Sequence, residues 1–129
     1  MGASVTPPDW SDKTVLIVED VNDNFLFLKT YLRKTKIAVL WAKDGQEAID
    51  MAAQDKSIDI VLMDIRMPNV DGYQATKEIK QFLPDLPIIA QTAYALNSDY
   101  QKVFDSGCDD YITKPILGVS LLEKMSAFL

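Results

Sequence analysis

The sequence predicts an α/β fold in which a parallel sheet is covered by helices on both faces. Short apolar runs rich in Val and Ile alternate with segments of helical spacing, and the clearest runs are unbroken rather than alternating. Unbroken apolar runs are typical of strands that are buried on both faces. Five such strand–helix units in succession predict a doubly wound sheet with right-handed crossovers.

The apolar runs define the expected strands, and the segments after them define the helices. The runs are Val15–Val18, Ile37–Trp41, Ile60–Met63, Ile88–Ala90 and Tyr111–Ile112. Four helices have apolar faces at helical spacing: Phe25, Leu28 and Leu32; Ala48, Ile49 and Ala52; Ala75, Ile79 and Phe82; and Leu121, Leu122, Met125 and Phe128. The expected caps are Asp23 or Asn24, Asp44, Asp71, and Asn97 or Ser98. Gly107 is expected to end the fourth helix.

Length and composition indicate one ordinary domain. The 129 residues can bury a core, and we expect residues 1–12 to be a flexible tail or interdomain linker before a domain at 13–129. No apolar run reaches the roughly 20 residues of a membrane span, so we expect no membrane contact by this domain. The single cysteine, Cys108, fits a reducing, cytoplasmic location. A net charge of −6 argues against direct nucleic acid binding.

Carboxylates stand at the ends of two expected strands. Glu19 and Asp20 follow the first strand, and Asp64 follows the third. Ligands of open parallel sheets bind beyond the carboxyl ends of the strands. If the two strands are neighbours, three carboxylates converge there, and their repulsion destabilises an empty site. A hard cation with oxygen ligands, Mg²⁺, would remove that cost.

Two more polar residues stand at the same edge. Thr92 follows the fourth strand in "IIAQTAYA", and Lys114 follows the fifth in "DYITKPI". A hydroxyl and an ammonium can bind the oxygens of a phosphoryl group. Asp64 would then be the nucleophile, because carboxylates form aspartyl phosphates. Each residue alone has an ordinary structural explanation, and their coincidence at successive strand ends favours the functional one.

Four motifs, in order and at family spacing, resemble the receiver domain of two-component response regulators. They are "VLIVED", "LMDIRMPNVDGY", "IIAQTAYA" and "GCDDYITKP", and the resemblance covers Lys13 to about Leu129. It implies a flavodoxin-like, CheY-like (βα)5 fold with strand order 2-1-3-4-5. It also implies that Asp64 accepts a phosphoryl group from a phosphohistidine. Glu19 and Asp20 would hold Mg²⁺ together with Asp64 and the backbone carbonyl of Arg66.

The resemblance also implies a conformational switch. Thr92 and Lys114 would contact the phosphoryl oxygens, and Tyr111 would turn inward after Thr92. The Lys114–Pro115 peptide is expected to be cis, and Gly72 matches the loop glycine of the family. The changed surface would be that of the fourth helix, fifth strand and fifth helix, which could also form a homodimer.

The resemblance implies a histidine kinase or histidine phosphotransfer domain as partner. No independent substrate turnover is expected, only assistance to phosphorylation and dephosphorylation of the domain's own Asp64. The "TPPDW" stretch favours the C-terminal receiver of a hybrid histidine kinase, which could be membrane-anchored, over a stand-alone regulator. A receiver that acts only as a scaffold stays open, although intact Asp64, Thr92 and Lys114 argue against it.

Three other classes of site fail at their defining residues. A phosphatase of the haloacid dehalogenase type needs a second aspartate at the position of Arg66. A calcium loop starting at Asp20 needs glycine where Phe25 stands and glutamate where Tyr31 stands. A dinucleotide-binding fold needs a glycine-rich turn after the first strand, and none follows.

Overall fold

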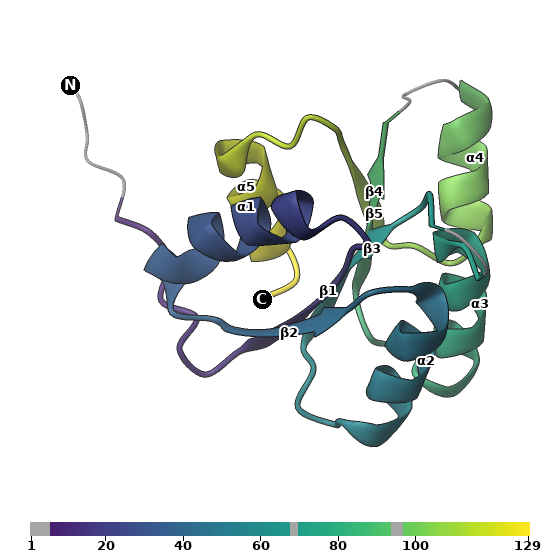
Figure 1. The fold of residues 1–129 in the computed structure, drawn as a ribbon, viewed down its shortest axis with the longest axis horizontal. Helices are drawn as coiled ribbons and strands as arrows, with labels where there is room; N and C mark the ends of the chain where they lie inside the picture. Colours follow the sequence, from purple (N-terminus) through teal and green to yellow (C-terminus); the bar gives the residue numbers. More distant parts are fainter. Residues whose placement is uncertain (1–5, 68–69, 94–96) are drawn as a thin grey trace.

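A five-stranded parallel sheet forms the centre of the molecule (Figure 1), with strand order β2-β1-β3-β4-β5. The computed structural model describes residues 6–67, 70–93 and 97–129. In chain order the elements are β1 (Thr14–Val18), α1 (Asn22–Leu32), the 3₁₀ turn η1 (Arg33–Thr35), β2 (Ala38–Ala42), α2 (Gly45–Gln54), β3 (Ile60–Asp64), α3 (Gly72–Phe82), β4 (Ile88–Thr92), α4 (Asn97–Asp105), β5 (Asp110–Thr113) and α5 (Gly118–Ser126). The predicted doubly wound fold and its strand order are confirmed.

Helices cover the two faces of the sheet as separate layers (Figure 1). Alternate residues of a strand point to opposite faces. Leu16 and Met63 therefore pack in a cluster with α2, α3 and α4. Ile17 and Leu62 pack in a second cluster with α1 and α5. The central strands β1 and β3 are buried on both faces, which explains their unbroken apolar sequences.

Two helix starts follow the predicted caps and one does not. Asp44 Oδ1 accepts a hydrogen bond from the Glu47 N–H at 2.8 Å, and Asp71 Oδ1 accepts one from the Gln74 N–H at 2.9 Å. The prediction for α1 is wrong, because this helix begins at Asn22 with Val21 as an N-cap that has no side-chain cap hydrogen bond. The turn before α1 must therefore be held by other contacts.

Helix ends also test the sequence pattern. Gly107 adopts a φ of 102° just beyond α4, as predicted for a residue that ends a helix. Phe82, predicted on the buried side of α3, is 42% exposed. The buried face of α3 continues from Ile79 to Leu83, which packs partly buried against the core, so Phe82 turns toward solvent.

Two strands end later than the sequence predicted. Asp64 and Thr92 are the last residues of β3 and β4 rather than the first residues beyond them.

Trp10 belongs to the packed domain, although the sequence placed it in the tail. Its side chain is 6% exposed and lies in the core cluster beneath α1 and α5. The backbone N–H of Trp10 donates to the Thr35 carbonyl at 2.7 Å, and the Trp10 carbonyl accepts from the Lys13 N–H at 2.9 Å. The packed region therefore begins at or before Trp10, earlier than Lys13.

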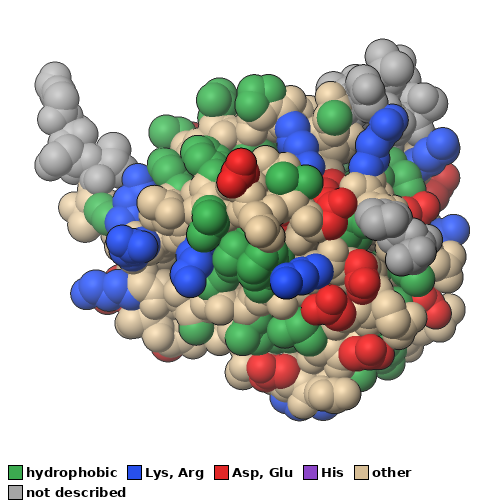
Figure 2. Space-filling model, viewed as in Figure 1, with side chains coloured by type: hydrophobic (Ala, Val, Ile, Leu, Met, Phe, Trp, Pro, Cys, Tyr) green, Lys and Arg blue, Asp and Glu red, His purple; other side chains and the backbone are tan. Residues whose placement is uncertain are grey.

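Large hydrophobic side chains are also exposed on one face. Figure 2 shows hydrophobic side chains gathered over α1 and α5. The exposed ones on α1 and around the start of α5 include Val21, Leu26, Phe27, Leu117 and Val119. Within the described residues, no helix combines the length and the hydropathy needed to cross a bilayer.

We expect Trp10→Ala to lower the free energy of unfolding by about 3 kcal/mol, because a buried indole is replaced by a cavity. Urea denaturation measures the loss. Asp12→Ala, at a neighbouring exposed position, is the matched control and should change the free energy far less. Equal small effects of the two substitutions would mean that Trp10 is not part of the cooperative domain.

Candidate functional site

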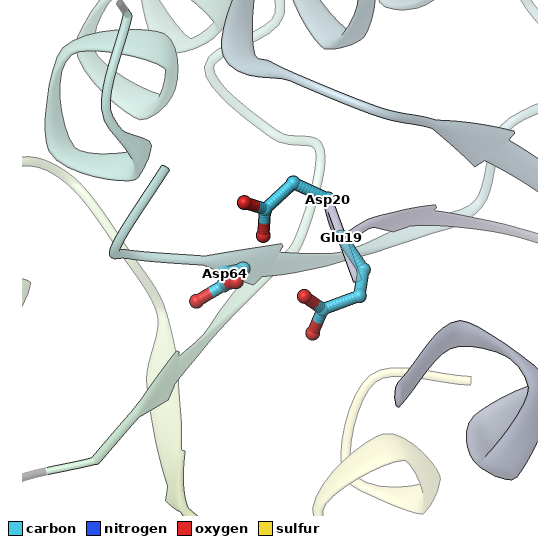
Figure 3. A group of neighbouring side chains, drawn as sticks. All are labelled: Glu19, Asp20 and Asp64. Atoms are coloured by element: carbon cyan, nitrogen blue, oxygen red, sulfur yellow. The ribbon is translucent and has the colours of Figure 1, made fainter. Parts of the chain in front are cut away.

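The three predicted carboxylates meet at the carboxyl edge of the sheet (Figure 3). β1 and β3 are hydrogen-bonded neighbours, with Val18 opposite Met63. The residues that follow this pair, Glu19 and Asp20 after β1 and Asp64 at the end of β3, therefore come together. Each offers a carboxylate oxygen, and these oxygens all lie within 4.8 Å of one another.

The three carboxylates differ in burial. Glu19 is 0% exposed and Asp64 is 3% exposed, whereas Asp20 is exposed on the turn before α1. Glu19 Oε2 accepts a hydrogen bond from the Val21 N–H at 3.2 Å. Among the described residues, Glu19 Oε1 has no hydrogen-bond partner. Burial, reinforced by the neighbouring Asp64 carboxylate, raises the pKa of Glu19 to about 7, and Lys114 opposes the rise.

Lys114 supplies a positive charge between the two buried carboxylates. Its Nζ lies 3.2 Å from Asp64 Oδ1 and 3.6 Å from Glu19 Oε1. The backbone N–H of Lys114 donates to the Thr92 carbonyl at 2.8 Å, which fixes the lysine backbone beside the end of β4. The Lys114–Pro115 peptide is cis, as expected. With Asp20 included, three carboxylates still exceed one ammonium, so the edge keeps an excess of negative charge.

These residues fit a divalent cation. The charge excess, a buried Glu19 oxygen that accepts no hydrogen bond from the described residues, and the all-oxygen donor set match a hard ion such as Mg²⁺. The Arg66 N–H donates to Asp64 Oδ1 at 3.2 Å, which draws the backbone of Arg66 toward the site. The arginine side chain itself is exposed.

The other predicted residues surround this centre at different distances. Thr92 is 6% exposed at the end of β4, next to the strand that carries Asp64. Tyr111 is half-buried on β5, where its ring meets the Phe104 ring edge-on at 6.3 Å between centroids. Lys124 Nζ lies 5.1 Å from the centroid of the Tyr111 ring. The tyrosine therefore lies against side chains of α4 and α5.

Gly72 keeps α3 close to the strand that carries Asp64. A Cβ on this glycine would collide with the Asp64 carbonyl oxygen and the Ile65 backbone. The Gly72 N–H donates to the Ile65 carbonyl at 3.1 Å. Only glycine allows this approach, so the residue predicted from the loop motif has a direct steric role beside Asp64.

Sequence reasoning missed Gln91, a buried polar residue next to the site. It is 1% exposed and lies opposite Asp64 in the β3–β4 register. Neither polar atom of its amide has a hydrogen-bond partner among the described residues. It lines a pocket of about 380 Å³ together with Glu19 and Lys114. The signal was available, because a glutamine interrupts the otherwise apolar stretch before Thr92.

Comparison with known families decides what this site belongs to. Residues 15–126 match the family model of the response regulator receiver domain. The chain belongs to the receiver domain family. It is 39% identical over 123 residues to hybrid signal transduction histidine kinase I of Dictyostelium discoideum, and the match covers 89% of this chain and 7% of that kinase. It is 34% identical to the polar-differentiation response regulator DivK of Brucella anthropi, over 91% of this chain and 96% of that protein.

Solved receiver domains have the same fold. One is the receiver domain of a Pseudomonas aeruginosa sensor histidine kinase with a magnesium ion in its active-site cleft: 34% identity, TM-score 0.83, covering 90% of this chain and 96% of that one. Another is the receiver domain of the Saccharomyces cerevisiae regulator Ssk1, crystallised with the phosphotransfer protein Ypd1. It has 33% identity and a TM-score of 0.85, with coverage of 97% and 91%. The chain is therefore a receiver domain of two-component signalling.

The raised pKa of Glu19 predicts how stability depends on pH in EDTA. The folded receiver domain holds the Glu19 proton up to about pH 7, whereas the unfolded chain releases it near the ordinary value of 4.5. Between these values the folded state binds more protons, so this group's contribution to stability falls as pH rises. Since one pKa unit corresponds to about 1.4 kcal/mol, we expect a loss of a few kcal/mol relative to Glu19→Gln.

Urea denaturation of both proteins at pH 5 and pH 7.5 measures this difference. Glu123→Gln, at an exposed position on α5, is the control and should follow the wild type. Wild type and Glu19→Gln that respond to pH in parallel would contradict the burial of an ionisable Glu19.

Gln91→Met should stabilise the receiver domain in EDTA. The methionine keeps a similar volume and removes two buried polar atoms that have no hydrogen-bond partner among the described residues, a gain of about 1 kcal/mol in the free energy of unfolding. Gln81→Met, at an exposed position of α3, is the control. A destabilised Gln91→Met protein would mean that the amide is satisfied in solution.

Proposed function

We propose that Asp64 is the phosphoryl acceptor of this receiver domain and that the donor is a phosphohistidine of a kinase or phosphotransfer protein. The observation that carries the proposal is the position of the Asp64 carboxylate, 3.2 Å from the Lys114 ammonium and beside Glu19 and Asp20. A carboxylate is a competent nucleophile toward phosphorus, and the neighbouring groups supply charges of both signs.

The chemical step exchanges one bond to phosphorus for another. An Asp64 carboxylate oxygen attacks the phosphorus, and an O–P bond forms as the N–P bond of the phosphohistidine breaks. The imidazole nitrogen leaves with the electron pair of that bond. The Lys114 ammonium and the Thr92 hydroxyl donate hydrogen bonds to the oxygens of the transferred group, so the chain contributes mainly position and electrostatics.

Glu19, Asp20, Asp64 and the backbone carbonyl of Arg66 are the residues that would hold Mg²⁺. When bound, the ion neutralises charge on the oxygens of the phosphoryl group. The support within this chain is the fit of the three carboxylates. A related receiver domain was crystallised with magnesium in its cleft.

The phosphoryl group would then change the surface formed by α4, β5 and α5. Lys114 and Thr92 carry the signal, because both contact the added group. Thr92 ends β4 and Lys114 directly follows β5. Tyr111 responds by leaving its contacts with Phe104 and Lys124. A homodimer through this surface is one form that the output could take.

The donor protein would be a histidine kinase or a histidine phosphotransfer protein. The yeast receiver domain was crystallised with a protein of the second class. The exposed hydrophobic side chains over α1 and α5 offer a contact surface beside the site. We place the domain in the cytoplasm, without direct contact to nucleic acid or membrane. We favour a hybrid histidine kinase as the parent over a stand-alone regulator.

Intact mass after incubation with acetyl phosphate and Mg²⁺ tests the proposal. We expect a gain of one phosphoryl group, and its loss in EDTA and in Asp64→Asn. Asp85→Asn changes an exposed aspartate outside the site and should still gain the group. A phosphoryl group still gained by Asp64→Asn would refute the assignment of Asp64 as the acceptor.

A protein donor distinguishes a receiver that needs its own phosphorylated partner from one that acts only as a scaffold. If acetyl phosphate adds no phosphoryl group, a phosphorylated histidine phosphotransfer protein is supplied instead. Transfer from that protein to the wild type but not to Asp64→Asn supports the proposal. No transfer from either donor would favour the scaffold.

A further inference from the structure

Trp41, on the edge strand β2, is bonded directly to the backbone of the acidic turn. Its indole N–H donates to the Glu19 carbonyl at 2.8 Å. The next residue of β2, Ala42, accepts a hydrogen bond from the Glu19 N–H at 3.0 Å. Both backbone polar groups of Glu19 are therefore held by the end of β2, one through the main chain and one through a side chain.

The same indole also holds the first turn of α1. The rings of Trp41 and Phe25 are stacked with centroids 4.0 Å apart and an angle of 4° between their planes. Phe25 is 5% exposed, whereas Trp41 is half-buried. Lys43 Nζ lies 5.0 Å from the centroid of the Trp41 ring. Trp41 thus connects β2, the Glu19 carbonyl and α1.

This connection matters because the turn has few other restraints. α1 has no side-chain cap at its N-cap residue, Val21. The one described side-chain bond inside the turn is from the Val21 N–H to Glu19 Oε2 at 3.2 Å. That oxygen belongs to one of the carboxylates that would bind the cation. A contact from outside the turn is needed to fix the backbone without using a carboxylate.

We propose that Trp41 is a positioning residue for the cation site: its indole N–H fixes the Glu19 carbonyl and thereby orients the carboxylates of Glu19 and Asp20. The inference rests on the proposed magnesium function of this edge. Groups that hold metal ligands in place typically contribute ten- to a hundredfold to metal affinity. Trp41 differs from such groups in holding the main chain rather than the ligating atom.

A purely structural role for Trp41 is the competing explanation, because its ring packs on Phe25. Trp41→Phe separates the two roles. The phenyl ring retains an aromatic face for Phe25 but cannot donate a hydrogen bond to the Glu19 carbonyl. Trp41→Leu removes the aromatic stacking as well. Trp10→Phe is the matched control for loss of an indole, because Trp10 lies just before β1 and the acidic turn follows the other end of that strand.

Metal affinity and stability are then measured separately. Binding of Mn²⁺, followed through the electron paramagnetic resonance of the free ion and displaced by Mg²⁺, gives the dissociation constants. Urea denaturation in EDTA gives the stability of the metal-free domain. We expect Trp41→Phe to weaken binding about tenfold and to lower the urea midpoint less than Trp41→Leu does, because it loses one hydrogen bond but keeps the aromatic face. Trp10→Phe should bind as the wild type does.

The indole N–H resonances supply a signature that packing alone would not produce. The chain has two tryptophans, so Trp10→Phe assigns both signals. Addition of Mg²⁺ to the wild type should shift the Trp41 indole resonance and leave that of Trp10 in place. This shift and the selective loss of affinity together establish the positioning role.

Three results would overturn the inference. Trp41→Phe that binds both ions as tightly as the wild type would remove the role of the N–H. A loss of affinity accompanied by a urea midpoint in EDTA as low as that of Trp41→Leu would assign Trp41 to packing. A wild type that binds neither ion would instead refute the proposed cation site itself, and the role of Trp41 with it.

Discussion

Two buried carboxylates, Glu19 and Asp64, share the ammonium of Lys114, and this arrangement imposes demands on the rest of the structure. The distances of 3.2 Å and 3.6 Å allow one cation to face both groups, but one positive charge does not balance two negative ones. Burial makes the unneutralised negative charge costly, as the raised pKa of Glu19 indicates. The edge is therefore prepared for a further positive charge and for an electrophile.

The sheet order delivers these groups to one place. β1 and β3 are neighbours at the centre of the sheet, so their carboxyl ends bring Glu19 and Asp64 together. β4 and β5 follow on the same side and bring Thr92 and Lys114. Gly72 lets α3 begin directly against the strand of Asp64. Apolar packing on both faces of the sheet holds this constellation in place.

Local sequence patterns predicted the strands and two of the caps because each depends on a short stretch of chain. Tertiary contacts decided the rest. Phe82 has the right spacing for the buried face of α3, yet Leu83 takes the place against the core. Trp10 lies in a proline-rich segment that resembles a linker, and its tertiary contacts with η1 and the core cluster place it in the domain. Such contacts leave no periodic signal.

The candidate site divides in the same way. The acidic residues, Thr92 and Lys114 stand at strand ends, where the topology of a parallel sheet brings them together. Trp41 was missed because its bond to Glu19 links residues far apart in the chain. Gln91 was missed although it interrupts an apolar stretch, since only the strand register shows that it lies opposite Asp64. The motifs identified the residues that we propose carry the chemistry, and the structure added residues that surround them.

The central question is whether a divalent cation relieves the repulsion between the carboxylates at this edge of the sheet. Unfolding in urea at pH 7.5 is compared in EDTA and in excess Mg²⁺, for the wild type and for Asp20→Asn. A ligand that binds only the folded state stabilises it, so we predict that Mg²⁺ raises the midpoint of the wild type and does so much less for the variant. The same midpoint with and without Mg²⁺ in the wild type would contradict the account.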